Sequence, residues 1–226
     1  MSDELHNEFQ SKSPYRYLVF DNILNKEAAD KIYESFPKID DGVWDNKTYI
    51  DQKNKFHKRN FEKNSIMQNV FDELNSKEFL NWLNYVTNIK EPLIADPELF
   101  GGGLHQSIKG AFLNVHVDYN LHPKTKYHRR INVLIYMNKA WKEEYEGHLE
   151  LWDINQSNRN LLEKISPKFN RCVIFDTHDQ SYHGLPNPIN FPSDNPRKSI
   201  ILYYYTKAPR PNDKVVVESP HSALWK

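Results

Sequence analysis

Two side chains near the middle of the chain have the types and the spacing of a metal-chelating pair. His116 and Asp118 lie two positions apart in a run of strand-forming residues, and residues two apart in a strand point to the same face of the sheet. His183, which follows the apolar run at 172–175, supplies a third ligand. Two histidines and one carboxylate on one face of an octahedral ion leave coordination positions open, which suits a reactive Fe(II) ion. The three residues alone do not distinguish metal binding from a structural role.

A fourth residue adds the binding of a carboxylate to this chemistry. Arg197 begins a strand whose apolar part is 200–205, and a cation at the mouth of a buried strand is costly unless it is paired. A guanidinium fork binds a carboxylate through two parallel hydrogen bonds. A dicarboxylate that chelates the metal at one end and meets Arg197 at the other would explain all four residues. The alternative is a local ion pair between Arg197 and Asp194.

The order His116-x-Asp118, His183, Arg197-x-Ser199 resembles that of the Fe(II)- and 2-oxoglutarate-dependent dioxygenases. The run 129–141 and the following Gly-His-Leu-Glu-Leu at 147–151 are similar to the prolyl 4-hydroxylase-like branch, which has a Tyr-Leu-Asn-Lys-x-Trp run followed by Gly-Gly-x-Leu. The resemblance covers about 99–207, roughly half of the chain. It implies an enzyme that couples decarboxylation of 2-oxoglutarate to hydroxylation of a C–H bond, with release of succinate and carbon dioxide.

The resemblance also implies roles for individual residues. Fe(II) would be held by His116, Asp118 and His183, and the distal carboxylate of 2-oxoglutarate by Arg197. Further cosubstrate contacts would come from Tyr136, Ser199 and Asn132, with packing as the alternative role of Tyr136 and Ser199. The substrate pocket would include Gln106, Tyr119 and Arg129. Dioxygen would be the other cosubstrate, and ascorbate would sustain activity.

Two features depart from the family pattern. The second glycine of the Gly-Gly pair is His148 here, and 148–150 is interpreted as an exposed strand edge. The polar segment 38–64 has no counterpart, which leaves the part of the protein that faces the substrate undefined. His105 occupies a strand position from which it would reach a pocket, but a strand histidine satisfied by a neighbour is the more common case.

The elements that must position these residues are mostly strands. After Pro97, short runs rich in Val, Ile, Tyr and Phe alternate with Gly, Pro, Asn and Asp, which is typical of a sandwich or barrel. Strands are predicted at 99–108, 111–118, 129–138, 147–153, 171–176, 180–185 and 197–206. The fold class is therefore mainly β within an α+β chain, and the resemblance makes its core, about 99–207, a double-stranded β-helix (jelly roll).

The N-terminal part, about 15–98, is predicted to place helices and loops on one face of that core. A short strand is expected at 17–20, a helix from Asn25 to just before Pro37, and two helices, or one broken helix, within 65–89. The segment 38–64 is a long loop, or one or two strands. Residues 1–14 are expected to be frayed and the tail 208–226 to run over the surface, so that 1–226 forms a single domain.

The composition limits the partners and the compartment. The 226 residues carry 30 Lys and Arg against 30 Asp and Glu, and a net charge of zero argues against nucleic acid or an anionic membrane surface as a partner. No apolar run approaches the roughly 20 residues that cross a bilayer, and the N-terminus lacks the order of a secretory signal. The single Cys172 excludes an intrachain disulfide, so we expect a cytoplasmic protein.

These features do not define the substrate, because proteins with the same fold carry sites for many different substrates. A prolyl residue, a free amino acid and another small metabolite are all open, and a homodimer through the N-terminal helices is an option. Two other functions also remain: a cupin-type protein that binds metal without consuming 2-oxoglutarate, and an inactive jelly-roll interaction module. The cupin interpretation gives no reason for Arg197.

Overall fold

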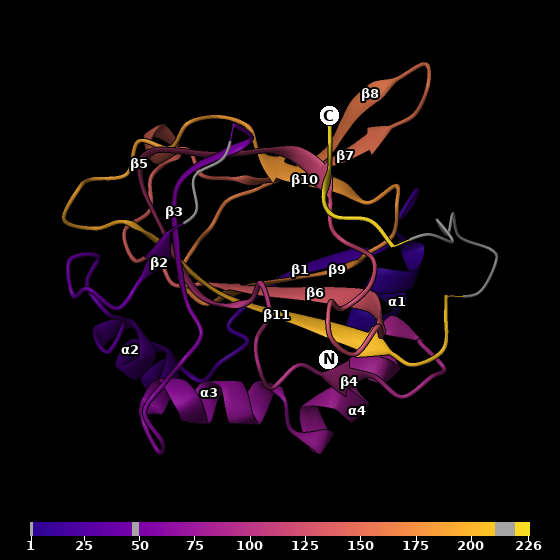
Figure 1. Ribbon diagram of the computed structural model, residues 1–226, viewed down its shortest axis with the longest axis horizontal. Helices are drawn as coiled ribbons and strands as arrows, with labels where there is room; N and C mark the ends of the chain where they lie inside the picture. The colour runs from indigo at the N-terminus through magenta and orange to yellow at the C-terminus, as the bar shows by residue number, and fades with distance from the viewer. Residues whose placement is uncertain (1, 47–49, 211–219) are drawn as a thin grey trace.

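The structure of the protein is a computed structural model that describes residues 2–46, 50–210 and 220–226 (Figure 1). The helices in these ranges are α1 (Ser2–Ser11), α2 (Lys26–Glu34), α3 (Ile66–Leu74), α4 (Lys77–Thr87) and the 3-10 helix η1 (Glu143–Tyr145). The strands are β1 (Tyr17–Asp21), β2 (Asp45–Asn46), β3 (Gln52–Lys58), β4 (Ile94–Ala95), β5 (Gly103–Val117), β6 (His128–Tyr136), β7 (Leu149–Ile154), β8 (Arg159–Ile165), β9 (Arg171–Asp176), β10 (Tyr182–Leu185), β11 (Arg197–Thr206) and β12 (Leu224–Trp225).

The strands form one antiparallel sheet that folds over on itself. Its order is β1-β9-β6-β11-β5-β10-β7-β8. The long strand β5 joins the two halves, because its first part pairs with β11 and its last part pairs with β10. Figure 1 shows β1, β9, β6 and β11 in one layer, with β10, β7 and β8 on the other side of the interior. The predicted jelly-roll core is therefore confirmed.

The helices cover the outer face of the layer formed by β1, β9, β6 and β11 (Figure 1). On β11, Ile200, Leu202 and Tyr204 belong to the apolar core beneath the helices. The intervening Ile201 and Tyr203 belong to the core inside the barrel. This alternation is the two-residue period of a strand with both faces covered. It also turns the odd-numbered residues of β11, including Arg197, toward the interior.

Two of the predicted helical regions are confirmed. Residues 65–89 form the two helices α3 and α4, because the Ser76 hydroxyl accepts a hydrogen bond from the backbone N–H of Phe79 and so begins a new helix. Helix α2 begins after Asn25, whose side chain accepts from the N–H of Ala28, and ends before Pro37. The helices thus pack on one face of the core, as predicted.

The prediction of a frayed N-terminus is wrong. Residues 2–11 form α1, which packs against α4. Leu5 and Phe9 lie one turn apart and are buried, and the ring nitrogen Nδ1 of His6 lies 2.8 Å from the carbonyl oxygen of Tyr85. Two apolar residues are too few to produce a visible period, although they are enough to hold a short helix on the core.

Two parts of the strand prediction differ from the structure, and for the segment 38–64 the structure has the strands that were one of its two predicted options. The strands expected at 99–108 and 111–118 are one strand, β5, with an irregular pairing near Gly110, whose φ is +79°. Strand β8 was not predicted, because most of its side chains are exposed and give no apolar alternation. The segment 38–64 contributes β2 and β3, and β3 pairs with β5. The polar segment is therefore part of the wall around the barrel interior.

The tail lies partly outside the described residues, because these omit 211–219. At its end, β12 pairs with the last part of β5 and leaves Leu224 and Trp225 partly exposed. None of the helices in the described ranges is long and apolar enough to cross a membrane.

Candidate metal centre

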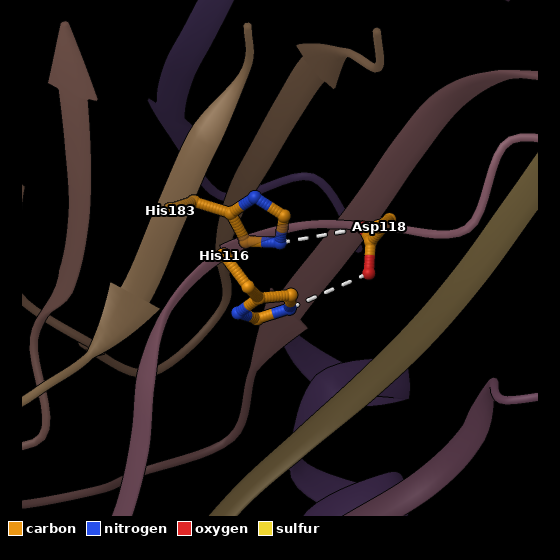
Figure 2. Close-up of side chains that lie close together, drawn as sticks. All are labelled: His116, Asp118 and His183. Carbon is orange, nitrogen blue, oxygen red and sulfur yellow. Dashed lines mark ion pairs between the residues drawn. The ribbon is translucent and has the colours of Figure 1, made fainter. Parts of the chain in front are cut away.

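The structure brings His116, Asp118 and His183 together inside the barrel mouth (Figure 2). His116 on β5 and His183 on β10 are direct cross-strand partners, so their rings lie side by side with centroids 4.6 Å apart. Asp118 follows the last residue of β5, and its two carboxylate oxygens lie 3.5 Å from Nε2 of His116 and 3.3 Å from Nε2 of His183. One ligand atom from each residue lies within 4.8 Å of the others.

The hydrogen bonds of His116 and His183 define which nitrogen of each ring has a lone pair available to bind a metal. Nδ1 of His116 lies 2.8 Å from the carbonyl oxygen of Asn114, and Nδ1 of His183 lies 2.9 Å from that of Ser181. A carbonyl only accepts, so each Nδ1 carries the proton and each neutral ring keeps a lone pair on Nε2. Burial and the neighbouring His183 lower the pKa of His116, which favours this neutral form. Lone pairs of both imidazoles and of Asp118 thus converge without a hydrogen between them, which fits a cation.

Asp118 is held in its ionised form by a buried network. Arg129 Nη2 donates to Asp118 Oδ2 over 2.8 Å, and Asn132 Nδ2 donates to the same oxygen over 2.8 Å. Burial alone would raise the pKa of Asp118, but the charge of Arg129 holds it well below its usual value. Arg129 itself lies 3.5 Å from the ring centroid of Tyr203 and 4.4 Å from that of Tyr119. The network fixes the direction of the carboxylate toward the histidines.

Arg197 forms the second half of the site. It is buried at the start of β11, its Nε donates to the carbonyl oxygen of Gly147 over 2.8 Å, and its guanidinium lies 4.9 Å from the ring centroid of Tyr136. The alternative ion pair with Asp194 is not formed, and Arg197 has no carboxylate partner among the residues that the structure describes. Burial lowers the pKa of Arg197, and the nearby Tyr136 opposes this shift. An unpaired buried guanidinium of this kind fits an incoming carboxylate.

Two hydroxyl groups beside Arg197 also lack partners. Within the described residues, neither Ser199 Oγ nor Tyr136 Oη makes a hydrogen bond of normal geometry. Ser199 lies two residues from Arg197 on the same face of β11, and it pairs across the sheet with Tyr136 on β6. A guanidinium and two free hydroxyl groups are therefore available to one carboxylate, in the place where the sequence predicted cosubstrate contacts.

The interpretation of 148–150 as an exposed edge is wrong. His148 and Glu150 are each 5% exposed, and the ring of His148 packs edge-on against Trp141 with centroids 5.1 Å apart. The structure explains why residue 147 is a glycine. A Cβ added at Gly147 would lie 3.1 Å from Cδ of Arg197, and the φ of +82° favours glycine. The glycine thus lets the chain approach Arg197 closely enough to accept its hydrogen bond.

The three predicted pocket residues do not line the cavity between the His116–Asp118–His183 group and Arg197. Gln106 turns to the opposite face of β5, where its side-chain amide donates to the carbonyl oxygen of Pro37, so its prediction as a pocket residue is wrong. The Tyr119 hydroxyl donates to the carbonyl oxygen of Phe100 and lies 2.9 Å from the hydroxyl oxygen of Tyr205. Arg129 binds Asp118. Asn132 does line the cavity, with its amide directed to Asp118.

Three cavity residues were not predicted as site residues. Lys55 on β3 and Ser107 on β5 line the cavity, and so does His105, which was expected to be satisfied by a neighbour. Neither ring nitrogen of His105 makes a hydrogen bond of normal geometry among the described residues, although the side chain is 5% exposed. The rest of the lining is largely apolar, with Leu134, Leu149, Phe175 and Leu185 among it. No periodic pattern in the polar segment 38–64 pointed to Lys55.

Comparison with known proteins relates the core to a family. Residues 102–205 match the model of the 2OG-Fe(II) oxygenase superfamily. No curated protein matches the sequence. The jelly-roll core therefore resembles the 2OG-Fe(II) oxygenase superfamily over this part of the chain.

Solved structures are similar over most of the chain. A prolyl-4-hydroxylase from Pseudomonas putida has a TM-score of 0.62 at 12% identity, over 89% of this chain and 98% of that one. A prolyl hydroxylase from Trichoplax adhaerens, solved with a hypoxia inducible factor peptide fragment, has a TM-score of 0.59 at 15% identity, over 91% and 89%. HygX from Streptomyces hygroscopicus, with nickel and 2-oxoglutarate bound, has a TM-score of 0.59 at 12% identity, over 99% and 98%. At these identities the similarity shows the fold, which is that of the prolyl 4-hydroxylases.

Proposed function

We propose that this protein is a 2-oxoglutarate-dependent Fe(II) hydroxylase of unactivated C–H bonds. His116, Asp118 and His183 hold the iron, and Arg197 with Tyr136 and Ser199 binds the distal carboxylate of 2-oxoglutarate. The observation that carries the proposal is the convergence of three lone pairs, from two Nε2 atoms and one carboxylate, beside a buried guanidinium without a counter-charge. A cupin-type metal site would explain the converging lone pairs, but it would not explain the unpaired guanidinium of Arg197.

The side chains around the site have separable tasks. Bound iron, 2-oxoglutarate and dioxygen would supply the oxidising chemistry, with succinate and carbon dioxide as coproducts. Arg129 and Asn132 keep Asp118 ionised and directed at the histidines. Gly147 orients Arg197 by accepting its Nε–H. The apolar lining formed by Leu134, Leu149 and Phe175 excludes water from the reacting groups.

The substrate is a prolyl residue, a free amino acid or another small metabolite. The fold is used by prolyl hydroxylases, one of them solved with a peptide fragment, and also by HygX, which was solved with hygromycin B bound. The fold thus supports both kinds of substrate. Ascorbate as a sustaining reductant, a homodimer and a cytoplasmic location are further parts of the proposal, to be tested by omission of ascorbate, by sedimentation and by cell fractionation.

Anaerobic titration with Fe(II) and 2-oxoglutarate tests the proposal. The wild-type protein should develop the weak visible metal-to-ligand charge-transfer band of a chelated 2-oxo acid. Asp118→Ala and Arg197→Ala should lose the band, whereas Asp40→Ala, which removes an exposed carboxylate far from the site in sequence, should keep it. His116→Ala should also lose 2-oxoglutarate turnover, measured as succinate formed in air.

Two results would overturn the hydroxylase proposal. Metal binding without the band and without succinate would favour the cupin interpretation. Absence of metal binding would make the four residues structural, as in an inactive interaction module.

A further inference from the structure

Lys55 occupies a row of side chains that leads across three strands to Arg197. Ser107 on β5 pairs with Lys55 of β3 on one side and with Arg197 of β11 on the other. Directly opposed residues in a sheet point to the same face, and all three line the same cavity as His116 and Asp118. Neighbouring strands lie about 5 Å apart, so Lys55 and Arg197 flank the cavity about two strand spacings apart.

A bulge turns Lys55 into the cavity. The pairing of β3 with β5 is irregular between Lys53 and Lys55, and Asn54 between them has a φ of +54°. Its Nδ2 donates to the carbonyl oxygen of Lys109 over 3.0 Å, which anchors the bulge to β5. Bulges next to active sites commonly redirect one side chain. Here Lys53 is exposed and Lys55 lines the cavity.

The charges around the cavity leave Lys55 without a counter-charge. Arg129 is neutralised by Asp118 over 2.8 Å. Arg197 is assigned to the cosubstrate under the function proposed above. Lys55 has no ion-pair partner among the described residues, and its neighbours in the cavity wall, His105 and Ser107, are uncharged hydrogen-bonding groups. Burial of an unpaired ammonium is costly, and an incoming anion would offset that cost.

We propose that Lys55, with His105 beside it, recognises an anionic group, a carboxylate or a phosphate, on the molecule that is hydroxylated. This inference rests on the proposed function and narrows it, because it favours a small metabolite with a free carboxylate or phosphate, such as a free amino acid or a sugar phosphate, over a prolyl residue within a peptide. Lys55 acts in substrate binding and leaves the binding of 2-oxoglutarate to Arg197. The ring nitrogens of His105 supply a second, neutral hydrogen bond to the same anion.

The test uses the anaerobic complex of the full chain with Fe(II) and saturating 2-oxoglutarate. The probes are the twenty free L-amino acids, each beside its C-terminal amide, and glucose 6-phosphate and ribose 5-phosphate, each beside the parent sugar. Binding is followed as a shift of the charge-transfer band. We expect a probe that carries the carboxylate or phosphate to bind, and its counterpart without that anionic group to bind at least about tenfold more weakly. The arm that responds identifies the anion as a carboxylate or a phosphate.

Variants assign the effect to Lys55. Lys55→Met should weaken binding of the anionic probe at least about tenfold and change the affinity for 2-oxoglutarate by less than about twofold. Lys55→Arg should retain most of the binding, because it keeps the charge, and Lys53→Met on the exposed face of β3 is the matched control. Retention of the band in Lys55→Met also shows that the variant is folded.

Each contrary result has its own meaning. If Lys55→Met weakens 2-oxoglutarate binding tenfold, Lys55 is a cosubstrate contact and the inference is wrong. It is equally wrong if probes without the carboxylate or phosphate bind as well as those with it, or if no probe with that group binds while the band is present. If the wild-type protein shows no band, the proposed function fails and this inference fails with it.

Discussion

Replacement of Lys55 by methionine should stabilise the metal-free protein. Burial lowers the pKa of Lys55 from its ordinary 10.5 to about 8, and the attraction of Asp118 only partly opposes this shift. At about 1.4 kcal/mol for each pKa unit, the charged side chain costs the folded state about 3–4 kcal/mol below pH 8. Because part of the side chain reaches solvent, we expect Lys55→Met to raise the free energy of unfolding at pH 7 by about 1–3 kcal/mol.

The pH dependence separates this charge effect from the added apolar surface. The pKa of Lys55 is lower in the folded than in the unfolded state, so the unfolded chain binds more protons between about pH 8 and pH 10.5. The Lys55 contribution to the stability of the wild-type protein therefore rises with pH across this window. The methionine variant lacks that rise, and its advantage should shrink as the pH approaches 10.5.

Urea unfolding of the metal-free proteins at pH 7 and at several values up to pH 10.5 measures this difference. Lys53→Met is the matched control, because it removes a lysine from the exposed face of the same strand and should change stability by less than about 0.5 kcal/mol. The reasoning is refuted if Lys55→Met is no more stable than the wild-type protein at pH 7. An advantage that stays constant up to pH 10.5 would refute the charge explanation.

Three further perturbations test other parts of the structure. Phe9→Ala should lower the free energy of unfolding by about 3–5 kcal/mol in urea, whereas a frayed N-terminus would give no change. Gly102→Ala places a Cβ 2.6 Å from the carbonyl oxygen of Ile201 and should destabilise the protein by at least about 1 kcal/mol; equal thermal midpoints would contradict the packing. Arg129→Met should weaken Fe(II) binding about 10- to 100-fold in a calorimetric titration, because Asp118 loses its orienting donor; unchanged affinity would show that Asn132 suffices.

Several features of the site follow directly from local sequence. His116 and Asp118 could be paired because a strand has a period of two, and the structure places their side chains together. Arg197 could be singled out because a cation before a long apolar strand needs a partner. The break between α3 and α4 lies at a serine that caps the second helix. In each case the decisive interaction lies within a few residues or follows from one simple period.

Gln106 shows where that period fails. It has the same parity as His116, and an uninterrupted strand would place both on one face. The pairing of β5 with β3 is irregular between Ser107 and Phe112, around Gly110, and this reverses the parity. As a result His105 and Ser107 line the cavity, while Gln106 lies among the contacts of the opposite face. The sequence shows that Gly110 is a glycine, but it does not show where along β5 the pairing with β3 changes register.

The bulge on β3 and the irregular pairing on β5 are coupled to each other. Asn54 on β3 and Gly110 on β5 both have positive φ, and the Asn54 side chain donates to Lys109 next to that glycine. The bulge on β3 turns Lys55 inward, and the irregularity on β5 turns Ser107 inward to meet it. Because this coupling joins residues more than fifty positions apart, no local pattern contains it. The grouping of His116, Asp118 and His183 is therefore predictable from the chain. The side chains proposed to bind the substrate depend instead on long-range pairing of a polar segment with the core.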